Sequence, residues 1–461
     1  MIHQYQNNGY HIVLDVNSGC VHVVDEPVYA AIPKLEAIAL CEENREKKIE
    51  QGVAAISSLE IGEDEKREIV EEILTLAEAG QLYTPDEYAS YIEEFQQRET
   101  VVKALCLHIA HDCNLACRYC FAEEGEYHGR RALMSYEVGR KALDFLVANS
   151  GSRINLEVDF FGGEPLMNWD VVKQLVAYGR SLEEPHNKKF RFTLTTNGVL
   201  LNDEIMEFVN REMSNLVLSI DGRREVHDRM RPFRGGQGSY DKVAETFRRA
   251  AESRQQKEYY VRGTFTRNNL DFTQDVLHLA DQGFEQISVE PVVADPKEDY
   301  AIREEDIPAI LEEYDRLAKE LLARRKAGRG VNFFHFMIDL KGGPCVAKRL
   351  SGCGAGTEYL AVTPWGDLYP CHQFVGREDY WMGNVTEGVL RKDLVKEFKS
   401  CSVYSKEKCR NCFAKFYCSG GCAANSQQVH GHINDVYDLG CELQRKRVEC
   451  AIMIKAAEAD L

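Results

Sequence analysis

The sequence lacks three features, and each absence excludes a class of protein. The chain of 461 residues has no apolar run near the ~20 residues that a membrane-spanning helix needs. Residues 1–8 lack the basic start and the apolar core of a signal peptide. The chain also lacks a basic surplus, since its formal net charge is −18. We therefore expect a cytoplasmic protein of two or three domains that binds neither a membrane nor nucleic acid.

Cysteine, in contrast, is abundant and unevenly placed. Sixteen cysteines in a cytoplasmic chain are not expected to form a disulfide scaffold. Three lie between positions 113 and 120, and ten lie between positions 345 and 450. Clusters of this kind are typical of metal binding. Five cysteines have no partner by spacing and are expected to be small buried hydrophobic residues, namely Cys20, Cys41, Cys106, Cys401 and Cys450.

The first cluster has the spacing C-x3-C-x2-C and consists of Cys113, Cys117 and Cys120. Three thiolates at this spacing can ligate three irons of a [4Fe–4S] cluster, because soft sulfur ligands suit iron. No fourth ligand lies nearby, so the fourth iron would be open to a substrate or cofactor. Spacing alone also allows three buried cysteines on a loop, or part of a zinc site.

From residue 103 onward the pattern alternates between apolar strands and amphipathic helices. Strands are predicted at 103–109, 154–161, 190–195, 215–220, 259–266 and 286–292, and helices at 136–148, 171–182, 240–253 and 307–325. Alternation of this kind indicates parallel βα units. Six units, where a closed barrel has eight, predict an α/β fold with an open, partial (β/α)6 barrel over residues 103–328.

The first 85 residues read as a separate small domain. Residues 10–24 predict a β-hairpin around Asn17-Ser18-Gly19, and Asp25 with Pro27 suits the start of a helix. A second helix is predicted over 64–79. The acidic stretch 84–99 is expected to be a linking helix, within a linker that we place at 86–102.

The cysteine octet, with Tyr119 directly before Cys120, resembles the signature of the radical S-adenosylmethionine (SAM) superfamily. Gly162-Gly163-Glu164-Pro165, after the second predicted strand, resembles the motif that receives the amino group of SAM. Further polar residues follow the third and fourth predicted strands, namely Thr196 with Asn197, and Ser219 with Arg231 beyond it. Each of these motifs alone is also an ordinary loop cap or surface pair, but together they occur in order after successive strands. The resemblance implies that SAM is bound by Tyr119, Gly162, Gly163, Glu164, Thr196, Asn197, Ser219 (the ribose) and Arg231 (the carboxylate).

The C-terminal cysteines resemble the SPASM domain of radical SAM peptide maturases. The resemblance implies a SPASM domain at 345–461, after a bridging region at 329–344, with two auxiliary [4Fe–4S] clusters. The first would take Cys353, Cys371, Cys422 and a fourth candidate, Cys345, and the second Cys409, Cys412, Cys418 and Cys441. Spacing alone also allows a zinc ribbon through Cys409, Cys412, Cys418 and Cys422. Without Cys345 the first cluster would keep an open iron for a substrate thiolate.

The N-terminal domain resembles the PqqD-like, winged-helix-type domains that bind a leader peptide as an added strand. The order of the three domains resembles maturases of ribosomally made peptides, above all those that form thioethers in six-cysteines-in-forty-five-residues peptides. This implies a Cys-rich precursor peptide with a leader as substrate. It also implies three [4Fe–4S] clusters, SAM, and a low-potential flavodoxin or ferredoxin as electron donor, in an anaerobe.

Two alternatives stay open at this point. Anaerobic sulfatase maturases, which make formylglycine, carry an acidic residue after the cysteine of a Tyr-Pro-Cys segment. Here the segment is Tyr369-Pro370-Cys371-His372, so that base is missing and no catalytic residue is assigned. The other alternative is a non-catalytic iron–sulfur electron carrier, which would need no SAM pocket.

Overall fold

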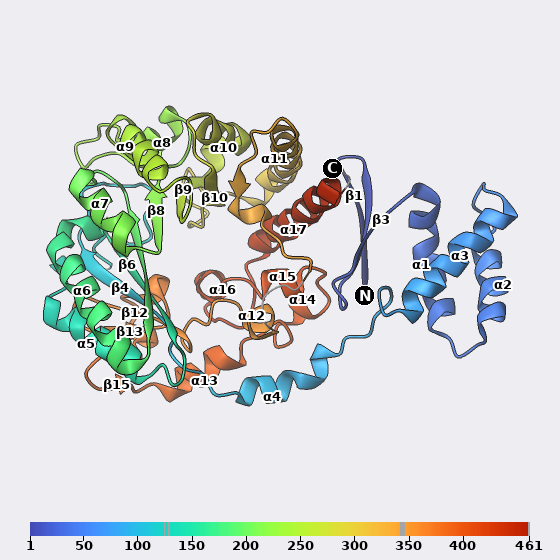
Figure 1. The fold of residues 1–461 in the computed structure, drawn as a ribbon, viewed down its shortest axis with the longest axis horizontal. Coiled ribbons are helices and arrows are strands. Elements are labelled where there is room, and N and C mark those ends of the chain that lie inside the picture. The colour runs from blue at the N-terminus through green and yellow to red at the C-terminus, as the bar shows by residue number, and fades with distance from the viewer. Residues whose placement is uncertain (124, 128–129, 342–345, 460–461) are drawn as a thin grey trace.

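The computed structural model of the protein describes residues 1–123, 125–127, 130–341 and 346–459 (Figure 1). The predicted ligand Cys345 lies outside the described residues. The molecule has a large α/β body and a small helical unit at one end, with the three-stranded N-terminal sheet between them (Figure 1).

Six parallel strands form the wall of the barrel. Their sheet order is β4 (Ala104–His111), β6 (Asn155–Gly162), β7 (Lys189–Thr196), β8 (Asn215–Ser219), β9 (Tyr259–Phe265) and β10 (Gln286–Pro291). The predicted partial (β/α)6 barrel is therefore confirmed, and each strand begins and ends within two residues of its predicted bounds.

Helices cover the outer face of these strands (Figure 1). They are α5 (Tyr136–Ala148), α6 (Trp169–His186), α7 (Asp203–Glu212), α8 (Arg224–Met230), α9 (Tyr240–Ser253), α10 (Phe272–Asp281) and α11 (Ile307–Lys326). The four predicted helices correspond to α5, α6, α9 and α11. Short elements complete the connections, namely β5 (Ala132–Leu133), η2 (Pro165–Asn168), η3 (Arg267–Asn269) and η4 (Glu304–Asp306).

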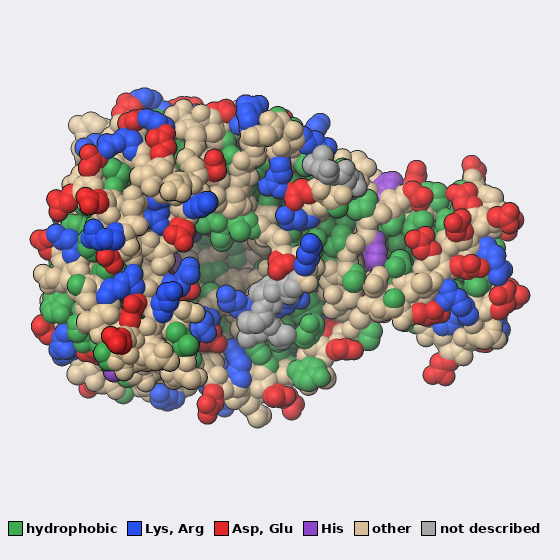
Figure 2. All heavy atoms as spheres, in the orientation of Figure 1, with side chains coloured by type: hydrophobic (Ala, Val, Ile, Leu, Met, Phe, Trp, Pro, Cys, Tyr) green, Lys and Arg blue, Asp and Glu red, His purple; other side chains and the backbone are tan. Residues whose placement is uncertain are grey.

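The two faces of the barrel strands differ in chemistry. On β6, Leu156, Val158 and Phe160 are fully buried, whereas the alternate residues Glu157 and Asp159 are more accessible. Because side chains alternate along a strand, the apolar set packs under the helices and the polar set lines the barrel interior. Figure 2 shows a hollow between the barrel and the C-terminal region, with Lys and Arg side chains around its rim. We call this hollow the chamber.

The C-terminal region continues the barrel sheet. Strand β12 (Tyr359–Val362) pairs in parallel with β4, and β13 (Asp367–Tyr369), β14 (Gly383–Asn384) and β15 (Gly388–Val389) follow in antiparallel order. At the other sheet edge, β11 (Asn332–Phe333) pairs with β10. The remaining elements are η5 (Phe334–Phe336), α12 (Val346–Ser351), η6 (His372–Phe374), η7 (Glu378–Tyr380), α13 (Lys392–Ser400), α14 (Glu407–Arg410), α15 (Lys415–Cys418), α16 (Ala423–His430) and α17 (Asp438–Ala459).

The N-terminal domain consists of a sheet of β1 (Ile2–Asn7), β2 (Tyr10–Asp15) and β3 (Val21–Val24), followed by α1 (Glu26–Leu40), α2 (Arg45–Ala55) and α3 (Glu63–Glu78). The hairpin and the Asp25 cap were predicted, and the Asp25 carboxylate accepts from the backbone N of Val28 at 3.0 Å. The helices enclose a core of their own, whereas Tyr5 and Ile12 belong to the core of the body. The Tyr5 hydroxyl donates to the backbone O of Glu449 on α17 at 2.9 Å.

The linker is less helical than expected. Within the predicted helix 84–99, only η1 (Tyr88–Tyr91) and α4 (Ile92–Gln97) form. Asp86 instead binds the C-terminal region, because its carboxylate accepts from Lys415 Nζ and from the Tyr404 hydroxyl, each at 2.6 Å. The linker is therefore fixed to the body by a partly buried ion pair.

Candidate active site

The loop that carries Cys113, Cys117 and Cys120 begins where β4 ends. Backbone hydrogen bonds of 2.9 Å hold it against the segment that follows α8, from the N of Ala116 to the O of Pro232 and from the N of Arg118 to the O of Met230. Placed there, the loop lies at the carboxyl ends of the parallel strands, where ligands of such folds bind.

Two glycines bring the next motif against this loop. The N of Gly163 donates to the O of Ala110 at 2.7 Å, and the N of Glu164 donates to the O of Asp112 at 2.9 Å. A Cβ on Gly162 would lie 2.3 Å from the O of Ala110, and one on Gly163 would lie 2.1 Å from the O of Asp112. Glycine is therefore required at both positions, because any side chain would push the motif away from the cysteine loop.

Glu164 is a buried anchor between two loops. Its carboxylate accepts from the N of Leu166 at 3.0 Å, from the Thr196 hydroxyl at 2.8 Å and from the N of Asn197 at 2.8 Å. Burial is the largest influence on this group and raises its pKa to about 7, although these three donors oppose the shift. The carboxylate thus fixes the loop after β6 to the loop after β7.

Thr196 and Asn197 differ in what they offer to a ligand. The Thr196 oxygen also accepts from the N of Gly198 at 3.0 Å, so its hydroxyl serves the loop itself. The Asn197 amide reaches the cysteine loop, with Nδ2 2.7 Å from Asn114 Oδ1 and 3.5 Å from Cys113 Sγ. Asn197 therefore lies beside the predicted iron ligands, and Thr196 supports it from behind.

A second network flanks the cysteine loop on its other side. The Tyr119 hydroxyl donates to the carboxylate of Asp221 at 2.7 Å, and Arg231 Nε lies 2.7 Å from that hydroxyl and 3.1 Å from Asp221. Asp221 also accepts from the N of Thr264 at 3.0 Å. Burial raises the pKa of Asp221, and Arg231 opposes this shift most strongly. Ser219 ends β8, two residues before this carboxylate.

The cysteine loop has the chemistry that a cluster requires. None of its three thiols forms a disulfide. Burial raises the pKa of Cys117 to about 12; Arg231 opposes the shift and Cys120 adds to it, which places a cation and a second thiol close by. Among the residues that the structure describes, no group of three His, Cys, Asp or Glu side chains is spaced to hold one metal ion. Thiolates of a [4Fe–4S] cluster bind different irons and do not converge on one ion.

The structure divides the C-terminal cysteines into two sets. Cys409, Cys412, Cys418 and Cys441 line one small cavity. Burial first, and then Cys422 and Cys353, raise the pKa of Cys371 to about 12, which indicates that these three thiols lie near one another. One set holds the four cysteines predicted for the second auxiliary cluster, and the other holds three of the candidates for the first, whose fourth candidate, Cys345, lies outside the described residues. The sets do not match a zinc ribbon, in which Cys422 would join Cys409, Cys412 and Cys418.

A buried lysine lies between the two sets. Lys406 is only 3% exposed, and its Nζ donates at 2.8 Å to the O of Gly420, a residue between Cys418 and Cys422. Lys406 also lines a cavity with Cys353 and Cys401. The sequence pattern did not identify this residue, because nothing in the spacing distinguishes a lysine that folds inward from one on the surface.

A histidine pair was also missed. His108 and His111 on β4 are almost fully buried, with Nδ1 of the first 3.0 Å from Nε2 of the second. The Tyr127 ring stacks on His111 at 4.5 Å, and Trp365 of the C-terminal region meets it edge to face. Burial lowers the pKa of His111 to about 4, so the ring is neutral at pH 7. The pair packs the barrel wall against the C-terminal region. The sequence did contain a signal for this pair, because two histidines within an otherwise apolar strand are unusual.

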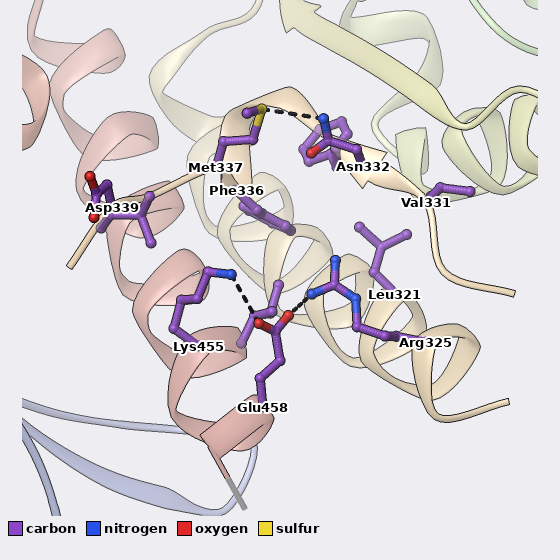
Figure 3. Close-up of a pocket in the computed structure, with 12 residues that line it drawn as sticks. Leu321, Arg325, Val331, Asn332, Phe336, Met337, Asp339, Lys455 and Glu458 are labelled. Atoms are coloured by element: carbon purple, nitrogen blue, oxygen red, sulfur yellow. Dashed lines mark hydrogen bonds and ion pairs between the residues drawn. The ribbon is translucent and has the colours of Figure 1, made fainter. Parts of the chain in front are cut away.

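A separate cavity of about 420 Å³ lies between α11, η5 and α17 (Figure 3). Its wall is partly apolar, with Leu321 and Phe336, and partly charged. Glu458 pairs there with Lys455, at 2.9 Å, and with Arg325. None of the predicted cysteine ligands or SAM-binding residues lines it, so this cavity is distinct from the candidate active site.

Comparison with known families agrees with this arrangement. Residues 107–266 match the radical SAM superfamily, and residues 353–413 match SPASM, an iron–sulfur cluster-binding domain. The chain therefore contains a radical SAM domain within residues 107–266 and a SPASM domain within residues 353–413. The radical SAM domain binds SAM and a [4Fe–4S] cluster, and the SPASM domain binds further iron–sulfur clusters.

Two curated relatives cover most of the chain. The radical SAM cyclopropyl synthase TigE of Paramaledivibacter caminithermalis is 21% identical over 75% of this chain and 72% of its own length. A cysteine-type anaerobic sulfatase-maturating enzyme of Clostridium novyi is 24% identical over 68% of this chain and 86% of its own. The chain is thus similar in sequence to a radical SAM cyclopropyl synthase and to a sulfatase-maturating enzyme.

Two solved structures share the fold. Native anSMEcpe with bound AdoMet has a TM-score of 0.64 and 21% identity, over 78% of this chain and 100% of its own. Streptococcus suis SuiB bound to S-adenosylmethionine has a TM-score of 0.51 and 17% identity, over 95% of this chain and 98% of its own. Within the described residues, no helix is both long and apolar enough to cross a membrane.

Proposed function

We propose that the protein is a peptide maturase that forms thioether bonds between a cysteine sulfur and a carbon of an acceptor residue in a ribosomally made, Cys-rich peptide. One observation supports the proposal above all others. The N-terminal sheet is packed against the body that contains the radical SAM and SPASM domains, and this sheet has an open edge. Similarity to a radical SAM cyclopropyl synthase and to a biosynthesis protein of the antilisterial bacteriocin subtilosin supports the same class.

The open edge belongs to β3. The N of Asp15 donates to the O of Cys20 at 2.9 Å, so Asp15 and Cys20 form a hydrogen-bonded pair of the hairpin. Bonded and non-bonded pairs alternate in an antiparallel ladder. His22 and Val24 therefore bond to β2, whereas Val21 and Val23 direct their N–H and C=O groups outward. An extended leader peptide can add there as a strand.

Charge favours a basic leader. Residues 1–85 contain sixteen Asp and Glu but only six Lys and Arg. A groove of about 840 Å³ also runs between the hairpin turn and the linker, where Tyr88 and Tyr91 line it beside Glu87 and Glu94. An acidic domain of this kind attracts a cationic peptide and speeds its capture.

The residues then divide the work of the reaction. When bound, SAM and the radical SAM cluster supply a radical that takes hydrogen from carbon, and the SPASM clusters supply an electron acceptor. We assign Cys113, Cys117 and Cys120, the two C-terminal cysteine sets and the predicted SAM contacts to holding these groups. Glu164 and Asp221 orient the loops around them, and the buried packing of His108 and His111 excludes water from that side of the barrel.

Mass spectrometry tests the proposal directly. The reconstituted enzyme is incubated with SAM, dithionite and a Cys-rich precursor peptide encoded beside its gene. Thioether formation removes two hydrogens and protects the bridged cysteine from alkylation, while the sulfur remains in the product. Peptide that keeps every thiol free to react with iodoacetamide, while SAM is consumed, would count against thioether formation.

The second candidate is formylglycine formation, which the relationship to sulfatase maturases supports. It would remove the sulfur from a cysteine and leave an aldehyde. Aldehyde-specific labelling of the same products separates the two reactions.

A further inference from the structure

The inner face of β9 and β10 carries charged residues that the candidate active site does not use. Arg262 and Glu290 lie on this face, and Arg262 Nη2 donates to Glu290 Oε1 at 3.4 Å. The Arg262 side chain stays 55% exposed despite this contact. Its guanidinium therefore still has N–H groups to offer to a ligand in the chamber.

A second arginine, Arg447 on α17, lies near Glu290. Arg447 is 7% exposed, and its Nε donates to the Tyr314 hydroxyl at 2.8 Å. Its Nη2 is buried and has no hydrogen-bond partner among the described residues. Buried donors are nearly always paired, because an unpaired buried donor destabilises the folded protein. Arg447 Nη2 is therefore a hydrogen-bond donor that could bind an acceptor on a ligand.

The local charge balance is positive. His335 Nε2 lies 3.7 Å from Glu290, but burial, followed by Arg447, lowers the pKa of His335 to about 3, so the imidazole is neutral. Burial alone would raise the pKa of Glu290, yet the guanidinium groups of Arg262 and Arg447 help to lower it. Arg262 thus contacts the Glu290 carboxylate directly and Arg447 adds a second positive charge nearby, while Ser288 Oγ lies 3.4 Å from His335 Nε2.

We propose that Arg262 and Arg447, with Glu290 and His335, form a subsite that binds a carboxylate of the peptide substrate. The planar fork of a guanidinium matches a carboxylate and supplies paired N–H donors. The carboxylate belongs either to an Asp or Glu side chain or to the peptide's C-terminus. The proposal rests on the proposed function only in taking a peptide as the ligand.

Chemical protection of Arg262 tests this subsite without any turnover. The cluster-loaded, full-length protein is treated with phenylglyoxal, and arginine modification is mapped by mass spectrometry. The probes are Gly-Cys-Gly-Asp-Gly and Gly-Cys-Gly-Asn-Gly, both blocked at their ends, and the Asn peptide with a free C-terminus. We expect millimolar Asp peptide to slow modification of Arg262 at least ~threefold relative to the blocked Asn peptide.

Arg191, on the inner face of β7, is the internal control and should react equally in all samples. If only the peptide with a free C-terminus protects Arg262, the subsite binds a terminal carboxylate. If the Asp peptide protects it, the subsite binds a side-chain carboxylate. Arg262→Gln should weaken binding of the protecting peptide ~tenfold, and Arg191→Gln should not. Equal protection by the three peptides, or none, overturns the proposal, and this readout holds even where no thioether forms.

Discussion

Individual residues in this site act mainly by positioning one another. Glu164 does not face solvent, because three donors already bind its carboxylate. Asp221 holds Tyr119 and Arg231 together in the same way. The sequence motifs predicted which residues gather at the site. They did not predict that Thr196 bonds to Glu164, or that Asp221 links two motifs, because these contacts join loops that follow different strands.

Arg231 offers a conservative test of the SAM pocket. We expect Arg231→Lys to weaken SAM binding at least ~tenfold, because lysine cannot bond to Asp221 and keep a second N–H pair free. Iron content should stay at the wild-type level. Anaerobic equilibrium dialysis with labelled SAM measures the change, and Arg229→Lys, on the exposed side of α8, is the matched control. If both variants bind SAM with equal affinity, Arg231 does not contribute to the SAM pocket.

Asp159 gives the chamber a pH dependence. Burial, followed by the nearby Glu157, raises its pKa to about 6. A raised carboxyl pKa means that the folded state binds the proton more tightly than the unfolded state. Its stabilising contribution is complete below the unfolded pKa and is lost as the pH rises through 6, about 1 kcal/mol of it between pH 5 and 7.

Infrared difference spectra of the wild type minus Asp159→Asn should therefore show a carboxylic acid band at pH 5 that disappears by pH 7.5. Glu157→Gln should move this transition to lower pH, because it removes a neighbouring negative charge. A spectrum without the band at pH 5 would mean that the carboxyl is ionised and would contradict the assigned environment.

Lys406 should raise the reduction potential of the auxiliary clusters, because a nearby cation and N–H donors stabilise added electrons. We expect Lys406→Met to shift the one-electron reduction equilibrium at least tenfold, or ~59 mV, toward the oxidised form. Redox titration followed by electron paramagnetic resonance measures it. Lys408→Met, which removes an exposed lysine paired with Asp438, should leave the potentials unchanged, and identical potentials in the two variants would refute the role.

Among the secondary-structure elements, periodicity predicted most of the barrel but little of what joins the domains. The six barrel strands were predictable because each buries an apolar face between turns. Strand β1 and helix α2 were not, since β1 is mostly polar and α2 buries only Ile49 and Gly52. The pairing of β12 with β4 joins residues more than 250 positions apart, and no local pattern encodes such a contact.

The packing of the N-terminal sheet decides how leader binding is tested. Deleting residues 1–85 would remove Tyr5 and Ile12 from the core of the body, so a point substitution is the better probe. Val23→Pro removes an outward N–H of β3 without breaking its bonds to β2. We expect it to weaken binding of a leader peptide at least ~tenfold, measured by fluorescence anisotropy. Val23→Ala keeps the N–H and should bind normally. Equal binding by both would exclude strand addition at β3.

On the scale of the whole molecule, strand pairing, an ion pair and hydrogen bonds join the barrel, the SPASM domain, the linker and the N-terminal sheet. The cysteine loop lies at the strand ends of the barrel, and β12 ties the SPASM domain to the strand that precedes this loop. The linker is fixed to the SPASM domain through Asp86 and Lys415. The N-terminal sheet is held by α17, which also supplies Arg447 to the chamber. The enclosed site is therefore built from all parts of the chain.

We expect cleavage of SAM to depend on Cys113, Cys117 and Cys120. The direct measurement is 5′-deoxyadenosine formation from SAM and dithionite by the anaerobically reconstituted protein, compared with the Cys113→Ala, Cys117→Ala, Cys120→Ala triple variant. We predict formation by the wild type and none by the variant, which should still carry the iron of the two C-terminal cysteine sets. Formation of 5′-deoxyadenosine by the triple variant, or its absence from a wild type loaded with all its iron, would contradict the account.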